Sequence, residues 1–147
     1  MAAGSKDQMK KIKEAIEFLC ERFPQFEHHM RAWEIVPNDK VYMVGVNPAR
    51  LSVNIDKFIP LSQPDTRGIL LHELGHVAIP GMMVAAKSKS ELYAAEMVIN
   101  DTFYEDYKAM HSTYMLEECM YFPHKWHMPR HQSFDVYVKL LREILEE

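Results

Sequence analysis

The run GILLHELGHVAIP, residues 68–80, places two histidines and a glutamate inside an otherwise apolar stretch. Burying these three side chains without partners would cost roughly several kcal/mol. A bound metal ion would offset that cost, whereas a surface position would leave the flanking isoleucines, leucines and valine unexplained. The run therefore predicts a helix that belongs to a hydrophobic core and also carries a metal site.

The spacing of the polar residues indicates the chemistry. His72 and His76 are four residues apart, about 40° around a helix and one turn above each other, so both can bind one ion. Glu73 lies beside the pair and can hold a zinc-bound water, whose pKa zinc lowers toward about 7, and accept its proton during attack on a carbonyl. We expect zinc ligands at His72 and His76 and a general base at Glu73. Iron, manganese or cobalt also suit such ligands, but the glutamate inside the motif favours zinc.

A third ligand is expected on the helix after the motif, where Glu91, Glu96 and Asp101 are the carboxylates available. Ser88 and Glu91 have the spacing of a capping box, in which each side chain binds the other's backbone amide. Both Glu91 and Asp101 point about 140° away from Glu96 around the helix. These two residues, or a loop histidine, are the alternatives if Glu96 does not bind the metal.

Glu96 is the ligand we predict, because it lies on the face that we expect to be buried. It shares that face with Leu92, Ile99 and Phe103. A carboxylate there needs a compensating charge, which the metal would supply. Asn100, one turn later, is expected to hydrogen-bond a ligating side chain from outside the ligand set.

Hydrophobic periodicity predicts an α+β fold, mainly helical, with a small β-hairpin or sheet beside the HELGH helix. We expect one domain over residues 1–147. The expected helices run from Ser5 or Asp7 to about Arg22, from about Pro64 to Ile79, over residues 88–107, and from Ser133 along the stripe Phe134, Tyr137, Leu140, Leu141 and Ile144. The expected strand pair is VYMVGV and RLSVNID, joined at NPAR, and residues 24–39 are expected to be loop or short helix.

Charge and cysteine content exclude several classes. A net charge of -4 without a basic cluster argues against nucleic acid and anionic membranes. No apolar run approaches the roughly 20 residues that span a bilayer, and the N-terminus is polar where a signal peptide is apolar. Two cysteines, Cys20 and Cys119, fit a reducing compartment. We expect a cytoplasmic protein of the producing or host cell, acting on a peptide or protein substrate.

Three segments together resemble a known family. Residues 45–79, ELYAAEMVIND and FPHKWHMPRHQSFDVYVKLLREIL are similar to the metallopeptidase-like domain of bacterial and phage proteins, which often precedes a von Willebrand A-type domain. The resemblance covers about residues 40–147 and implies a zincin-like fold, with His72, Glu73 and His76 on its zinc motif and Asn100 on its asparagine. Glu96 replaces the family's aspartate, and Gly81 stands where many members have another histidine.

A second group of candidates lies in the loop before the last helix. Cys119, His124, His127 and His131 have the composition of a second metal site, but their spacing matches no zinc module known to us. We interpret the histidines as facing solvent or substrate. If this loop folds over the zinc, His124, His127 or Tyr121 could stabilise an oxyanion.

The main alternative to an enzyme is a catalytically idle zincin scaffold that binds a protein partner or serves as a structural module, for instance in a phage. The intact Glu73 favours the enzyme, because a structural zinc site needs no base. For a peptidase, the RLSVNID strand is expected to pair with an extended substrate beside the zinc.

Overall fold

The computed structural model describes residues 3–145 and has the α+β class that the sequence predicts, with helices dominating a small sheet. The helices are α1 (Ala3–Arg22), α2 (Glu27–Arg31), α3 (Ile55–Phe58), α4 (Gln63–Ala78), α5 (Lys89–Thr102), α6 (Tyr104–Ala109) and α7 (Phe134–Leu145). The strands are β1 (Glu34–Pro37), β2 (Val44–Asn47) and β3 (Arg50–Val53). Short 3-10 turns η1 (Pro24–Phe26) and η3 (Pro123–Trp126) and a π-helical turn η2 (Tyr114–Glu118) complete the chain.

The sheet has the order β1-β3-β2. β2 and β3 form the predicted antiparallel pair, in which Val46 faces Leu51, and the turn is closed by the Ala49 amide donating to Asn47 Oδ1 at 2.9 Å. β1 lies parallel to β3, on the side of β3 away from β2. We predicted loop or short helix for residues 24–39, so this strand was not expected. β3 is therefore the central strand, and the prediction that it offers an edge to a peptide is wrong.

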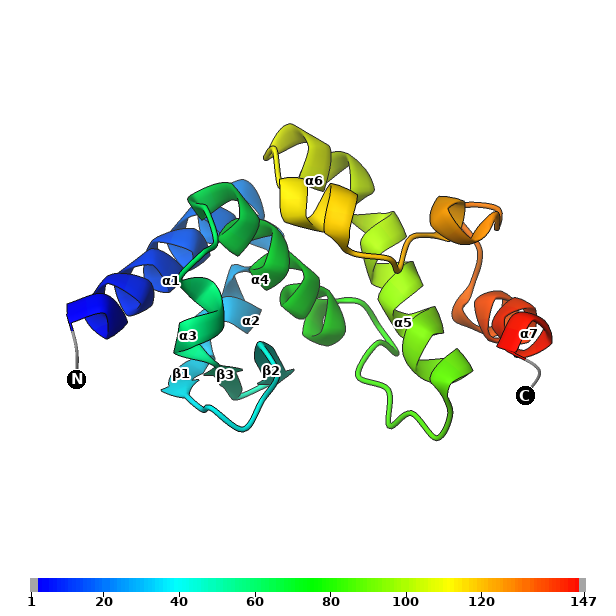
Figure 1. Ribbon diagram of the computed structural model, residues 1–147, viewed down its shortest axis with the longest axis horizontal. Coiled ribbons are helices and arrows are strands. Elements are labelled where there is room, and N and C mark those ends of the chain that lie inside the picture. The colour runs from blue at the N-terminus through cyan, green and yellow to red at the C-terminus, as the bar shows by residue number, and fades with distance from the viewer. Residues whose placement is uncertain (1–2, 146–147) are drawn as a thin grey trace.

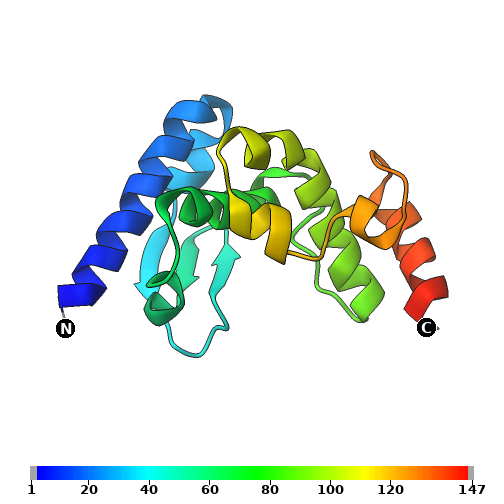
Figure 2. The same ribbon diagram turned by 45° about the horizontal axis from the view of Figure 1, so that its top comes forward.

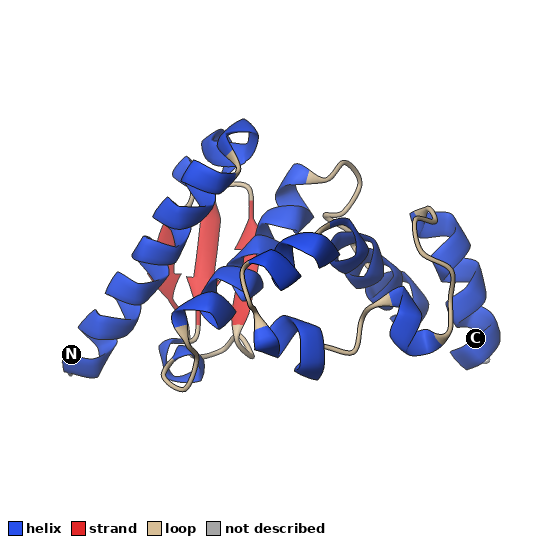
Figure 3. Cartoon of the chain, turned by 90° about the horizontal axis from the view of Figure 1, so that it is seen from above, coloured by secondary structure: helices blue, strands red, loops and turns tan. Residues whose placement is uncertain are grey.

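α4 lies in the middle of the molecule and packs against both α1 and β2 (Figures 1 and 3). Its bounds agree with the predicted 64–79 to within a residue. Ser62 caps it by accepting a hydrogen bond from the Asp65 amide at 3.2 Å, and the helix ends just before Pro80. Fully buried side chains from α1, β3, α3 and α4 form the larger hydrophobic core, among them Ile12, Leu19, Leu51, Phe58, Leu70, Leu71 and Leu74.

The chain after α4 adds a second, smaller core at the end of the molecule opposite α1 (Figures 1 and 2). It consists of α5 and α7 side chains with Met128: Ala94, Met97, Tyr137, Val138 and Leu141. Val138 is buried in the α7 stripe, whereas Ile144, which we placed in that stripe, is 51% exposed. The helix predicted over 88–107 is interrupted at Phe103, which separates α5 from α6.

The predicted capping box at the start of α5 is formed only in part. The Glu91 amide donates to Ser88 Oγ at 3.2 Å, as expected. In return, Glu91 Oε1 accepts a hydrogen bond from the Ser88 hydroxyl, at 3.3 Å, where we expected the Ser88 backbone amide as donor. Within residues 3–145, no helix is long and apolar enough to cross a membrane.

Candidate metal centre

Two helices meet at the HELGH motif and bring three candidate ligand side chains together. His72 and His76 lie one turn apart on α4, with ring centroids 5.0 Å apart and planes at 84°. Glu96, from α5, places one carboxylate oxygen against His72 Nε2 and the other 3.4 Å from His76 Nε2. The two Nε2 atoms thus converge on one carboxylate.

Each imidazole is held from behind through its other nitrogen. His72 Nδ1 lies 2.7 Å from Asn100 Oδ1, and His76 Nδ1 lies 2.9 Å from the Met82 carbonyl oxygen. Both oxygens can only accept, so both Nδ1 atoms carry the hydrogen and, in the neutral rings, the Nε2 lone pairs face Glu96. This is the arrangement that histidine ligands of metals have in proteins.

Asn100 is fully buried and uses its whole amide group. Besides His72, its Oδ1 accepts a hydrogen bond from the Tyr107 hydroxyl at 3.0 Å. Its Nδ2 donates to the Tyr121 carbonyl at 2.9 Å and to Cys119 Sγ at 3.4 Å. The donations by Nδ2 fix the orientation of the amide and therefore present Oδ1 to His72.

Charge interactions in the centre are strong because it is buried. Burial opposes the charged form of His72, but the Glu96 carboxylate outweighs burial and raises the pKa of His72 to about 9. Burial also opposes ionisation of Glu96, yet the two histidines lower the pKa of this carboxyl well below its ordinary value. Glu96 is therefore a partly buried carboxylate whose negative charge is balanced either by protonated histidines or by a bound cation.

Glu73 differs from Glu96 in its environment. Ligand atoms of His72, Glu73 and His76 all lie within 4.8 Å of one another, so Glu73 is close to any ion held by the two imidazoles. Burial raises the pKa of Glu73 to about 6, although the two histidines oppose that rise. Both Nε2 atoms face the Glu96 carboxylate, so Glu96 is the candidate third ligand and Glu73 is the candidate group for proton transfer.

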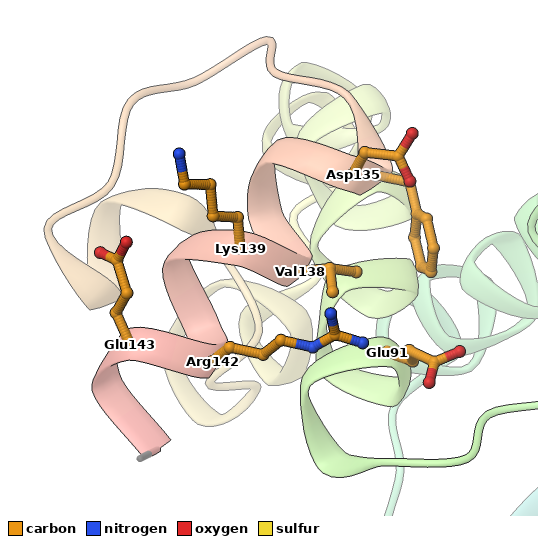
Figure 4. A pocket seen from close by; sticks show the side chains of 7 residues that line it. Glu91, Asp135, Val138, Lys139, Arg142 and Glu143 are labelled. Carbon is orange, nitrogen blue, oxygen red and sulfur yellow. The ribbon is translucent and has the colours of Figure 1, made fainter. Parts of the chain in front are cut away.

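The alternative third ligands lie elsewhere. Glu91 lines a groove of about 510 Å³ between the start of α5 and α7, where Figure 4 shows it near Arg142. Asp101 accepts hydrogen bonds from Arg130 Nε at 2.6 Å and from the His131 amide at 2.8 Å. One expectation about the ligand's surroundings was wrong, because Leu92 is 47% exposed while Ile99 and Phe103 are buried.

The loop candidates do not form a second metal site. Among the described residues, none of Cys119, His124, His127 and His131 belongs to a group of three or more His, Cys, Asp or Glu side chains close enough to hold an ion. His124 packs against Tyr104 and Phe122, and His131 lies 3.5 Å from Asp101. Cys119 is a free thiol beside Asn100.

A pocket of about 270 Å³ opens beside His72, Glu73 and Glu96. Of the three proposed oxyanion donors, Tyr121 lines it, whereas His124 and His127 do not. Its remaining walls come from residues 42–44, Ile69, residues 114–115 and Cys119. Sequence spacing could not indicate these walls, because they come from separate loops and turns that only the folded chain assembles.

Comparisons of the chain with protein-family models, with curated proteins and with solved structures found no match.

Proposed function

We propose that the protein is a zinc-dependent hydrolase with a zincin-like site, most simply a peptidase, as the resemblance to the metallopeptidase-like domain family also implies. His72, His76 and Glu96 are the proposed zinc ligands. One observation carries the proposal: a buried and a partly buried imidazole aim their Nε2 atoms at one carboxylate while hydrogen bonds hold both Nδ1 atoms. The donor set of two nitrogens and one carboxylate suits a catalytic zinc site.

Glu73 is the proposed proton-transfer group. A bound zinc ion supplies Lewis acidity, which makes water a nucleophile near neutral pH. Glu73 accepts a proton as the water oxygen attacks the carbonyl carbon, and then delivers that proton to the leaving amine. Burial raises the pKa of Glu73 above that of an exposed glutamate, which favours its acceptance of the proton from water.

An edge strand of the sheet is the proposed binding site for an extended peptide substrate. β2 lies at one edge of the sheet and packs beside α4, and Val44 at its start lines the pocket. An extended peptide paired with β2 would pass the metal centre with its backbone hydrogen-bonded. Tyr121, which lines the pocket, is the proposed donor to the developing oxyanion.

The zinc content of the purified full chain tests the ligand set. We expect one zinc per chain in the wild type and in Glu73→Gln, and loss of zinc in His72→Ala and Glu96→Ala. Glu105→Ala is the matched control, since Glu105 is an exposed carboxylate on the neighbouring helix α6. A wild-type protein that binds no zinc, even when zinc is added, would contradict the proposal.

Hydrolysis of a peptide library by the zinc-loaded protein tests the reaction. We expect cleavage by the wild type and at least a hundredfold loss in Glu73→Gln, with zinc content unchanged. A zinc-loaded protein that cleaves no peptide would instead support the idle scaffold, in which the ion serves only to join helices.

A further inference from the structure

The pocket beside Glu73 has an apolar character apart from the metal centre itself. Met43, Val44, Ile69, Tyr114 and Met115 contribute much of its lining. Apart from its tyrosines and Cys119, the ionisable side chains among the described residues of this lining are His72, Glu73 and Glu96. The pocket thus offers contact to an apolar group and no counter-charge beyond the metal centre.

The wall opposite β2 is held in place by side chains from outside the pocket. The Tyr114 amide donates to Asp65 Oδ1 at 2.9 Å, which fixes the start of η2 to α4. Lys125 Nζ donates to the carbonyls of Leu116 at 2.8 Å and Cys119 at 2.6 Å, which fixes its end. A pocket formed in advance binds its ligand without the cost of ordering a loop.

Gly68 on α4 allows the wall that contains Met115 to pack closely against this helix. A Cβ at Gly68 would lie 2.7 Å from Ser112 Cβ and 2.9 Å from Met115 Cγ, closer than two carbon atoms can pack. Met115 is 3% exposed, so its side chain is part of the core as well as of the pocket. The apolar lining is therefore built into the fold.

We infer that this pocket takes one neutral, apolar substrate side chain next to the scissile bond, of the leucine, methionine or phenylalanine class. The inference rests on the proposed function. A cavity of about 150 Å³ can hold benzene, so the 270 Å³ here accommodates a side chain of that class. A lysine or aspartate side chain would lose its hydration against methionine, valine and isoleucine, and outside the metal centre the described lining offers it no acidic or basic side chain other than tyrosine and cysteine.

Methyl NMR tests the pocket without requiring hydrolysis. The chain, with its methionine methyl groups labelled with ¹³C, is titrated with the N-acetyl amides of leucine, phenylalanine, lysine and aspartate. We expect the leucine and phenylalanine probes to shift the Met43 and Met115 signals saturably, and the charged probes to leave them unchanged. Met83 and Met120, which are 48% and 54% exposed, do not line the pocket and serve as internal controls.

The two proposals can fail separately in this experiment. Selective shifts in a protein that binds no zinc would support the apolar pocket and overturn the zinc hydrolase. Equal shifts with charged and apolar probes, or no shifts at Met43 and Met115 in a zinc-loaded protein, would overturn the pocket while leaving the zinc site.

Met43→Lys tests the specificity directly, because Met43 is only partly buried and a lysine there adds a charge to the pocket. We expect at least a tenfold weaker affinity for the leucine probe, measurable binding of the aspartate probe, and a matching change of cleavage preference in the zinc-loaded protein. Met83→Lys is the control, and Met43→Gln replaces the lysine variant if that variant does not fold. Unchanged preference in a folded Met43 variant would contradict the inference.

Discussion

Tyr107 illustrates how a single hydroxyl supports a ligand that it does not contact. It is fully buried and donates to Asn100 Oδ1, the same atom that holds His72 Nδ1. Removing a residue that hydrogen-bonds a metal ligand typically lowers metal affinity 10- to 100-fold. Because Tyr107 lies one hydrogen bond further back, its effect should fall at the lower end of that range.

We therefore expect Tyr107→Phe to weaken zinc binding about tenfold and to lower the free energy of unfolding by about 1 kcal/mol. Competition with a chromogenic chelator measures the first quantity and urea unfolding the second. Tyr137→Phe is a matched control, since Tyr137 is also fully buried and donates to the Pro129 carbonyl at 2.8 Å in the second core. Equal loss of zinc affinity in both variants would mean that the effect is general destabilisation.

At the scale of single residues, helical spacing and the expected burial of one helix face selected the group that the fold brings together: His72, Glu73, His76, Glu96 and Asn100. It did so because helical geometry fixes which side chains share a face. Tyr107 and the Met82 carbonyl could not be selected in this way. Their positions depend on a helix break and on a loop, and hydrophobic periodicity describes neither.

At the scale of elements, Gly75 inside the HELGH motif sets how closely α5 approaches α4. A Cβ at this position would lie 2.5 Å from Ile99 Cγ2 and 3.1 Å from Phe103 Cε2. Glu96 and Asn100 belong to the same helix as Ile99 and reach the histidines from there. Moving α5 outward would therefore lengthen every contact of the metal centre that crosses between the two helices.

We expect Gly75→Ala to lower the free energy of unfolding and to weaken zinc binding together. Alanine gains up to about 1 kcal/mol in helix propensity, but overpacking costs about 1–3 kcal/mol, so the net effect is destabilising. Urea unfolding and chelator competition measure the two effects. Gly45→Ala should alter neither, because a Cβ there meets Val41 at an ordinary 3.6 Å. A stabilised Gly75→Ala protein with normal zinc affinity would refute this account.

Helices and strands with a pattern in their own sequence were predictable. Short elements, and those whose ends depend on tertiary packing, were not. α1, α4 and α7 carry apolar stripes or caps, and the β2–β3 pair has alternation and an Asn-Pro turn. β1 has four residues, none of them fully buried, so no alternation marks it. The break at Phe103 involves neither glycine nor proline, and the sequence around it reads as one continuous helix.

At the scale of the whole molecule, the candidate metal centre lies between α4 and α5, and α5 belongs to both hydrophobic cores. α4 contributes Leu74 to the larger core, whereas α5 contributes Ala95 and Ile99 to the larger core and Ala94 and Met97 to the smaller one. An ion held by histidines of α4 and a glutamate of α5 would tie these helices together. Its binding energy would then stabilise the folded chain as a whole, since the unfolded chain lacks the site.

Zinc should therefore raise the melting temperature of the protein. At a free zinc concentration 100 times Kd, the folded state gains about 2.7 kcal/mol, which for a chain of this size corresponds to a rise of roughly 5–10 °C. Differential scanning calorimetry with zinc and with EDTA measures the difference. Glu73→Gln should keep the rise and Glu96→Ala should lose it, because we assign only the latter residue to the ligands. A rise that persists in Glu96→Ala would place the ion on α4 alone, and the two cores would then be held together by packing without its help.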